Sequence, residues 1–353
     1  MPGITLPIGI SFFTFQAISY ITDVYMGGQA APSIINVALY ISFFPQLIAG
    51  PIVKYKDINK QIEGRSISWI KISKGFKRFV YGLAKKVLIS NTLGLCVDTI
   101  YAYDIAQIDC KTAWIGALAY TFQIYYDFSG YSDMAIGLGC MFGFTIPENF
   151  NYPYLSRSIT EFWRRWHISL GTWFREYVYI PLGGNRKGKI RTYVNLLIVF
   201  FLTGLWHGAD MSFVIWGLYH GFFVVVERLS KMKILDKSKV LSTIYCFLVV
   251  NFGWVFFRAE NTIIGIRYVT RMITPWRHIS AGIASWNYMD VKTIFIGVIA
   301  FCGMGLIRSA TSEKIIEIWN DSAIEAVYCT ILLILSLASI VSNTYNPFIY
   351  FQF

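Results

Sequence analysis

Apolar stretches long enough to form membrane-spanning helices recur along most of the chain, and charged residues are concentrated between them. A helix that crosses the bilayer core needs roughly 20 predominantly apolar residues. The pattern therefore predicts an all-α integral membrane protein. The predicted spans are residues 4–25, 34–53, 79–100, 112–128, 133–146, 191–209, 211–228, 240–258, 291–309 and 323–341.

Two of these stretches, 112–128 and 133–146, are separated by a polar sequence around Gly130. The second is too short to cross the membrane alone, so we expect the pair to form one broken or re-entrant unit. The stretch 79–100 contains two adjacent lysines and is expected to lie partly along the interface. The chain then has about 8–10 transmembrane or re-entrant helices, and without repeats or linkers it is predicted to be a single domain.

The composition and the placement of charge support this class. Only 14% of the 353 residues are charged, whereas soluble domains carry roughly 25%. The net charge of +11 is concentrated in the loops 54–78, 157–191 and 228–239, so we expect no nucleic-acid partner. Positive loops stay on the cytoplasmic side. We therefore predict a multi-pass protein of the inner or plasma membrane, with these loops in the cytoplasm and the loop 258–290 outside.

The segment 157–191 interleaves tryptophan and tyrosine with arginine, a pattern typical of amphipathic helices at the membrane surface, where we expect it to bind lipids. A glycine-rich turn at 181–189 closes the segment. Residues 183–189 fit G-x-x-x-x-G-K, but Ile190 replaces the serine or threonine that binds magnesium. No strand is predicted before them, so a nucleotide phosphate loop is excluded.

The sequence contains no G-x-S-x-G motif, no C-x-x-C pair and no Cys/His cluster with zinc spacing, so no metal site and no serine nucleophile are predicted. Cysteines in apolar stretches usually act as small buried hydrophobic residues. We expect this role, without disulfides, for Cys96, Cys140, Cys246, Cys302 and Cys329.

Histidines in or near the apolar stretches are the strongest candidates for chemistry, because polar residues are costly inside a membrane. His207 lies toward the outer end of its predicted span, where Gly204 and Gly208 allow close approach of another helix or of a substrate. From the pattern alone it is either a hydrogen-bonding residue between helices or a catalytic one. His167, beside two arginines, either contacts lipid phosphates or belongs to a site. His220 is expected to pack between helices.

Two carboxylates, Asp127 and Asp133, flank the predicted helix break. At membrane depth a carboxylate faces a water-filled cavity or pairs with a basic group or backbone N–H. Two interpretations remain open at this point. The residues either line a substrate site or cap the two broken helices, and Asp133 is a natural N-cap.

Seven strings in the sequence resemble those of the bacterial membrane-bound O-acyltransferases, and within them the alginate O-acetylation protein branch. Among them are Phe162-Trp163-Arg164-Arg165-Trp166-His167 and Leu205-Trp206-His207-Gly208-Ala209. The others span residues 6–12, 44–52, 126–133, 179–186 and 347–353. Members of that family carry further spans before the string at 6–12, so we expect this chain to lack them.

The resemblance implies a ring of tilted helices around a thinned centre, with a tunnel where a cytoplasmic thioester meets an acceptor from outside. It implies acetyl-CoA or another acyl thioester as donor, a polysaccharide acceptor, and an acetyltransferase outside the membrane as partner. It also implies that His207 is catalytic and that His167 is a second catalytic candidate. The residues predicted to bind substrate are Trp206, Asp127, Asp133, Arg164, Arg165, Asn185 and Arg186.

The predicted mechanism is direct acetyl transfer to a hydroxyl group. A neutral imidazole can accept a proton at neutral pH, so His207 would deprotonate the acceptor. His167 or a nearby backbone N–H would then stabilise the oxyanion. A cationic face would hold either the phosphates of coenzyme A or anionic lipid, and it comprises Arg164, Arg165, Arg186, Lys187 and Lys189.

Two alternatives remain. The first is D-alanyl transfer to teichoic acid, which is chemistry from the same superfamily. The second is a transporter or flippase whose polar breaks line a pathway, although transporters usually carry such breaks in two repeated halves.

Overall fold

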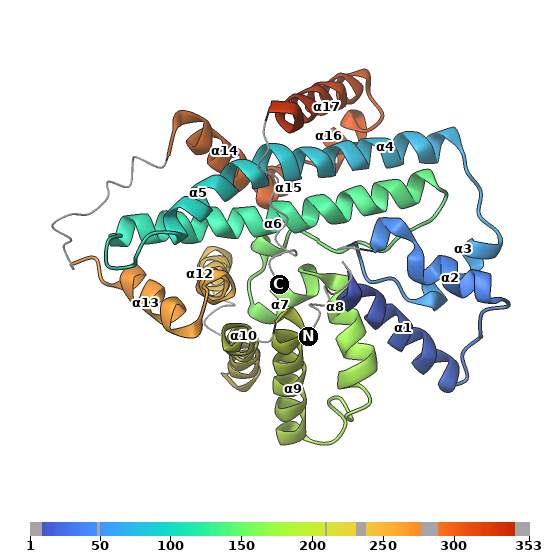
Figure 1. The fold of residues 1–353 in the computed structure, drawn as a ribbon, viewed down its shortest axis with the longest axis horizontal. Coiled ribbons are helices and arrows are strands. Elements are labelled where there is room, and N and C mark those ends of the chain that lie inside the picture. The colour runs from blue at the N-terminus through green and yellow to red at the C-terminus, as the bar shows by residue number, and fades with distance from the viewer. Residues whose placement is uncertain (1–8, 48–49, 209, 231–237, 277–288, 343–353) are drawn as a thin grey trace, which may run out of the picture.

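A computed structural model describes residues 9–47, 50–208, 210–230, 238–276 and 289–342, and the regular elements in these ranges are all helical (Figure 1). Six helices in the described ranges are long and apolar enough to cross a membrane. This confirms the prediction of an all-α membrane protein. The six are Trp69–Tyr101, Lys189–His207, Met211–Ser230, Lys239–Arg258, Val291–Ala310 and Ala323–Ser342.

The described elements of the N-terminal part are short, and residues 4–8 of the predicted span 4–25 lie outside the described ranges. These elements are α1 (Ile10–Tyr25), α2 (Ile34–Ser42), the 3-10 turn η1 (Phe44–Gln46) and α3 (Tyr55–Glu63). The prediction of one helix over 34–53 is wrong. Pro45 lies in η1, and because proline has no N–H to donate it does not continue a helix. The buried chain that follows is held by the Tyr40 hydroxyl, which donates to the Val53 carbonyl at 2.9 Å.

Two long antiparallel helices form the centre of the molecule. The first consists of α4 (Trp69–Ala84), the π-helical turn η2 (Lys85–Ser90) and α5 (Asn91–Tyr101), and the second is α6 (Cys110–Met141). The predicted break around Gly130 is wrong, because α6 runs through it without interruption. The carboxylate beside the expected break, Asp133, pairs with Lys85 and Arg78 of the first long helix, so it needs no opening in α6 to hydrate it.

Close packing between α4 and α6 explains the glycine near the expected break. A Cβ atom at Gly130 would lie 2.7 Å from the Gly82 carbonyl oxygen, and one at Gly75 would lie 2.5 Å from the Gly137 carbonyl oxygen. On both helices the glycines are seven residues apart. Two glycine pairs therefore bring the two backbones into contact.

Replacing Gly137 with leucine should prevent this contact and reduce the amount of folded protein in the membrane. The added side chain meets backbone atoms of α4. Such overpacking typically lowers the free energy of unfolding by about 1–3 kcal/mol. The matched control is Gly297→Leu in α14, where an added Cβ meets no atom within 4 Å. Membrane levels measured by immunoblot should fall only for the first variant, and equal levels would contradict the packing argument.

The second half of the chain contains both short and long helices. The short elements are η3 (Pro153–Leu155), α7 (Ile159–Arg165), α8 (Ile168–Phe174), the π-helical η4 (Arg175–Tyr179), α13 (Thr262–Ile273), η6 (Cys302–Leu306), α15 (Ile307–Ala310) and α16 (Glu313–Trp319). The long ones are α9 (Lys189–His207), α10 (Met211–Ser230), α12 (Lys239–Arg258) and α17 (Ala323–Ser342), and α14 (Val291–Phe301) continues through η6 into α15. The five predicted spans from residue 191 onward each match a long helix or the continuous unit α14–η6–α15.

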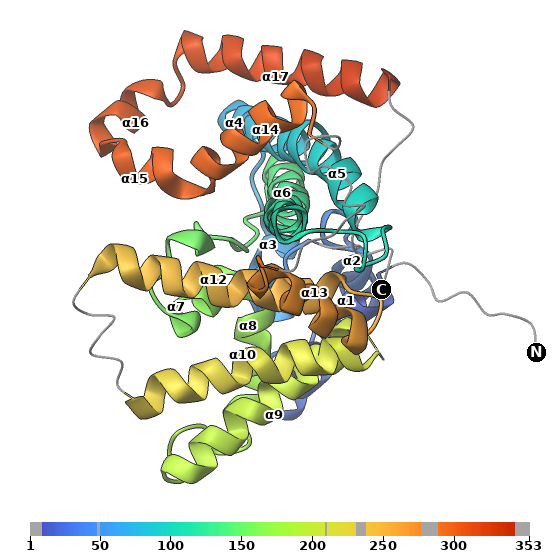
Figure 2. The same ribbon diagram turned by 90° about the vertical axis from the view of Figure 1, so that its left-hand side faces the viewer.

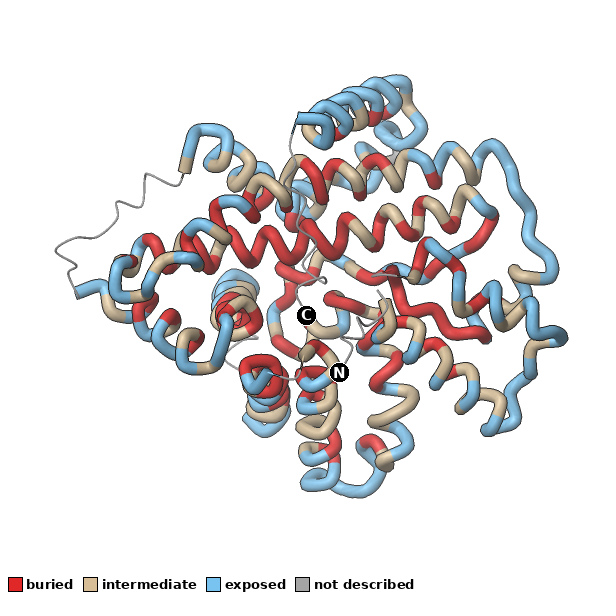
Figure 3. The backbone as a smooth tube through the Cα atoms, in the orientation of Figure 1, coloured by how far each residue is buried: buried red, intermediate tan, exposed pale blue. Residues whose placement is uncertain are grey.

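The short helices α7 and α8 lie in the middle of the molecule, surrounded by α6, α12, α10, α9 and α1 (Figures 1 and 2). Buried residues are concentrated along α6 and this central segment, whereas most residues of α17 are exposed (Figure 3). The segment predicted as amphipathic thus carries its aromatic side chains into the core and leaves Arg164 exposed.

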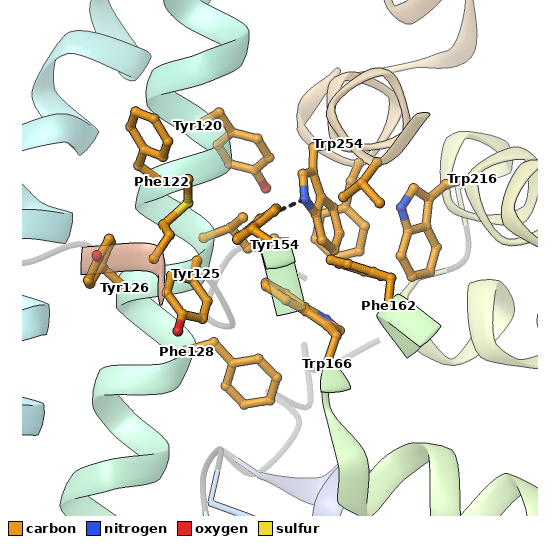
Figure 4. Packing of buried hydrophobic residues seen from close by; sticks show 14 of the residues in the cluster. Tyr120, Phe122, Tyr125, Tyr126, Phe128, Tyr154, Phe162, Trp166, Trp216 and Trp254 are labelled. Atoms are coloured by element: carbon orange, nitrogen blue, oxygen red, sulfur yellow. Dashed lines mark hydrogen bonds between the residues drawn. The ribbon is translucent and has the colours of Figure 1, made fainter. Parts of the chain in front are cut away.

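The core around α7 is built mainly from aromatic rings. Phe162 and Trp166 stack with 5.6 Å between ring centroids. The indole of Trp254 donates a hydrogen bond to the Tyr154 hydroxyl at 3.1 Å (Figure 4). Three of the cysteines predicted to be buried are buried in separate helices, and they are Cys96, Cys246 and Cys329. Cys140 and Cys302 are half-buried.

Basic loops far apart in the sequence meet at one end of the molecule. Lys54 and Lys56, from the first basic loop, both pair with Glu176 of the second, at 3.0 and 2.9 Å. Burial raises the pKa of Glu176, but hydrogen bonds from Lys56 and Lys54 outweigh it, so the net pKa is lowered. These contacts fit the prediction that the two loops lie on the same side of the membrane.

Candidate functional site

His207 is the last residue of α9, and aromatic rings surround it. Its ring centroid lies 4.7 Å from that of Trp206, 5.1 Å from Trp216 and 5.0 Å from Phe257. Helix α10 packs directly against this end of α9, because a Cβ at Gly208 would lie 2.5 Å from the Phe213 ring. The close helix approach predicted from the glycines is therefore present, and α10 provides it.

His167 occupies the junction between α7 and α8, where the chain turns sharply. Its φ of 46° lies in the left-handed region, which is uncommon for a residue other than glycine. The side chain is only 2% exposed. Its Nδ1 lies 3.2 Å from Oδ1 of Asn149, and its ring lies 4.6 Å from that of Phe128. Burial, with a smaller contribution from nearby His207, holds the pKa of His167 well below its usual value.

Trp206 lies next to both histidines. Its ring centroid is 6.2 Å from that of His167 and 4.7 Å from that of His207. Phe15 of α1 stacks on Trp206 at 5.3 Å and on Trp173 at 4.0 Å. The fold therefore brings together three of the predicted site residues, although they lie in two segments about 40 positions apart.

A cavity of about 560 Å³ opens between α7, α8, α9 and α10. His167 is part of its wall, and most of the other lining residues are apolar. Arg164, Arg175 and Arg228 also line it, and all three are exposed. The arrangement gives a largely apolar cavity with exposed cations and an imidazole in its wall.

A second, smaller cavity of about 230 Å³ shares Arg175 and Arg228 with the first. Its lining adds Asn185 and Arg186 from the glycine-rich turn. Three predicted binding residues thus border the two cavities, and these are Arg164, Asn185 and Arg186. Arg175 and Arg228 are not among the binding residues predicted from the sequence, because only the fold shows that basic residues of separate loops converge.

The structure places the other predicted binding residues elsewhere. Arg165 pairs with Glu161 at 2.8 Å. Asp133 pairs with Lys85 at 2.5 Å and with Arg78 at 2.6 Å, and Asp127 pairs with Lys86. Neither aspartate caps a broken helix, because α6 is continuous at both positions. The lysines of the stretch 79–100 thus face carboxylates of α6.

One further carboxylate, missed from the sequence, orients the helix that leads to His167. Glu227, near the end of α10, accepts hydrogen bonds from the backbone N–H groups of Ile159 at 2.6 Å and Thr160 at 3.1 Å. These groups lie in the first turn of α7, where N–H groups have no partner within the helix. Because this capping contact joins elements distant in sequence, no local motif indicates it.

His220 is fully buried in the aromatic core. Its ring centroid lies 5.1 Å from that of Trp163 and 5.3 Å from that of Trp216. Like His207, it lines neither of the two cavities, but its ring contacts do not include Trp206. This position agrees with the packing role expected for it.

The sequence profile of the membrane-bound O-acyltransferase family matches residues 26–259, which include both histidines and the residues around the cavities. The chain belongs to the membrane-bound O-acyltransferase family. It is therefore an acyltransferase, and with its six apolar helices it is a multi-pass protein of the cell membrane.

Several members of this family are similar to the chain over most of its length. A probable alginate O-acetylase of Pseudomonas putida is 42% identical over 99% of the chain and 76% of its own length. A peptidoglycan O-acetyltransferase of Helicobacter pylori is 34% identical, covering 99% of the chain and 75% of that protein. A teichoic acid D-alanyltransferase of Bacillus subtilis is 28% identical over 72% of the chain and 69% of its own length.

Proposed function

We propose that this O-acyltransferase transfers acetyl groups from a cytoplasmic thioester, acetyl-CoA, across the membrane for O-acetylation of a secreted or cell-surface polysaccharide. The relatives named for O-acetylation are 42% and 34% identical to it, whereas the D-alanyltransferase is 28% identical. An alginate-like polymer is the acceptor that the first of these names favours. An acetyltransferase outside the membrane is the proposed intermediate carrier.

The observation that carries this proposal is the cavity beside His167. An acyl thioester of coenzyme A has phosphates at one end and a long, weakly polar arm that ends in the reactive group. Arginine binds phosphate strongly through paired N–H donors, and Arg175 and Arg228 border both cavities. The apolar wall suits the arm, and His167 lies where the thioester would arrive.

Both histidines fit a direct transfer. The acceptor hydroxyl oxygen attacks the thioester carbonyl, its proton passes to an imidazole, and the carbon–sulfur bond breaks. The imidazole then returns the proton to the departing thiolate, so atoms and charge balance. His207 is the proposed proton acceptor, and its contacts with Trp206, Trp216 and Phe257 exclude water from the ring.

The structure weakens the case for transport. That alternative requires polar breaks that line a pathway, and α6 is continuous where the one break was expected. Intramembrane carboxylates that serve an ion pathway usually face a water-filled cavity. Asp127 and Asp133 instead pair with basic residues of the first long helix, and neither lines the two cavities.

The proposal is tested with cell membranes, the polysaccharide and acetyl-CoA labelled in the acetyl group. Membranes that contain the protein should transfer label to polymer, and membranes from a deletion strain should not. We expect Arg228→Gln to raise the half-saturating acetyl-CoA concentration about tenfold, because one charged hydrogen bond to phosphate is lost. Arg157→Gln is the control, because Arg157 is exposed and borders neither cavity.

Two results would overturn parts of this proposal. Equal labelling with and without the gene product would reject acetyl transfer from coenzyme A. Identical concentration dependence for Arg228→Gln and wild type would reject the cavity as the donor site and leave anionic lipid as its occupant.

A further inference from the structure

Asn149 is a buried residue between α6 and η3 that contacts the chain on both sides of the turn at His167. It is 0% exposed. Its Oδ1 accepts hydrogen bonds from the Ser169 N–H at 3.2 Å and the Ser169 hydroxyl at 2.9 Å, and it lies 3.2 Å from Nδ1 of His167. Its backbone carbonyl accepts the Ile168 N–H at 3.0 Å. One residue therefore holds the strained turn and the imidazole together.

The orientation of the Asn149 amide follows from its partners. A backbone N–H can only donate, so the atom facing Ser169 N must be the oxygen. The amide nitrogen in turn donates to the Ser132 hydroxyl of α6 at 3.2 Å. A side-chain amide oxygen cannot donate, so the hydrogen bond with His167 requires the proton to be on Nδ1. In the neutral imidazole Nε2 then carries a lone pair.

We propose that Asn149 is a positioning residue that fixes His167 as the tautomer protonated at Nδ1, with Nε2 as the hydrogen-bond acceptor in the active site. Nε2 is buried and has no hydrogen-bond partner among the described residues, although the ring lines the cavity. A buried acceptor without a partner is costly. A hydroxyl group of the acceptor next to the attacking one would be its partner.

This assignment rests on the proposed function, and it changes the part predicted for His167. A neutral imidazole with a bare Nε2 cannot donate a hydrogen bond to an oxyanion through that atom. Stabilisation of the oxyanion then falls to a backbone N–H, the other group considered from the sequence. His167 orients the acceptor by taking a hydrogen bond from a neighbouring hydroxyl through Nε2, which leaves the proton of the attacking hydroxyl to His207. It depends on Asn149 to keep Nε2 unprotonated.

The tautomer can be measured without any activity assay. The chain has four histidines, so protein labelled with [15N]histidine in lipid nanodiscs gives few imidazole signals, and His167→Gln identifies those of His167. We expect one protonated nitrogen, Nδ1, in the wild type. We expect a mixture of tautomers in Asn149→Leu, which keeps the side-chain volume but removes the oxygen. Detection of Nε2–H as the main wild-type form would overturn the proposal.

Two further variants separate positioning from general damage to the core. Asn149→Asp keeps an oxygen acceptor for Nδ1–H and should preserve the tautomer. Asn251→Leu removes an equally buried amide that bonds Ala117 and Thr121 of α6, and it should leave the His167 signals unchanged. A change of tautomer in Asn251→Leu, or none in Asn149→Leu, would contradict a specific role for Asn149.

Polysaccharide acetylation in cells supplies the second readout. Asn149→Leu should lower acetyl content about 10- to 100-fold at normal membrane levels, because misplacing a reacting group by about 1 Å can cost about 10²-fold. Asn149→Asp should recover part of this loss. If the tautomer responds as expected while no strain acetylates polymer, the proposed function fails and the positioning role stands.

Discussion

Cells that carry His207→Gln in place of the wild-type protein should lose about 99% or more of the gene-dependent acetyl esters on their polysaccharide. Glutamine has a similar size and forms hydrogen bonds, but it cannot accept a proton from the acceptor hydroxyl. General base catalysis contributes about 10²–10⁴-fold to such a reaction. The measurement is acetate released from purified polymer by mild base, with the membrane level of each variant followed by immunoblot.

His220→Gln is the matched control for this experiment. His220 is at least as deeply buried as His207 and contacts the same Trp216 ring, and neither histidine borders the two cavities, but only His207 contacts Trp206, which lies beside His167. It should retain acetylation wherever the protein accumulates. Normal acetate from His207→Gln would reject the mechanism. If cells without the gene lose D-alanine from teichoic acid and keep the acetyl groups of their polysaccharide, the chain is instead a D-alanyltransferase.

The sequence predicted the long helices well because their apolar length alone determines whether they can cross a membrane. It failed where polar residues have partners far away in the chain. The stretch around Gly130 resembled a helix break because it contains glycine and serine and is followed by Asp133. In the fold Gly130 packs against Gly82, and Asp133 pairs with Lys85 and Arg78. A single sequence gives no local sign of such pairing.

In the site, too, local features could be predicted from the sequence and long-range contacts could not. His167 and His207 could be predicted because histidine near apolar stretches is uncommon, and because both belong to strings that resemble the family. Their convergence around Trp206 and the contact with Asn149 are tertiary. Arg228 was counted only as a loop charge, yet its position at the end of α10 places it beside Arg175 at both cavities.

Removing one partner of the buried pair between Lys86 and Asp127 should destabilise the protein more than removing one partner of an exposed ion pair does. The side chains are only 8% and 1% exposed, and the Ser90 hydroxyl also donates to Asp127 at 3.3 Å. Asp127→Leu would leave the Lys86 charge without this carboxylate, at a cost of about 3–5 kcal/mol. The apparent unfolding temperature in detergent should fall clearly, whereas Glu313→Gln, which breaks the exposed pair with Arg308, should change it little.

The double variant Lys86→Met with Asp127→Leu decides between structure and substrate binding for Asp127. Replacing both charges with apolar side chains of similar volume is often neutral or stabilising, so the unfolding temperature should recover. Recovery of acetylation as well would show that the carboxylate only balances Lys86. Recovery of stability without acetylation would restore Asp127 to the substrate site predicted from the sequence. If the double variant is as unstable as Asp127→Leu, the unpaired Lys86 charge is not the reason why Asp127→Leu unfolds at a lower temperature.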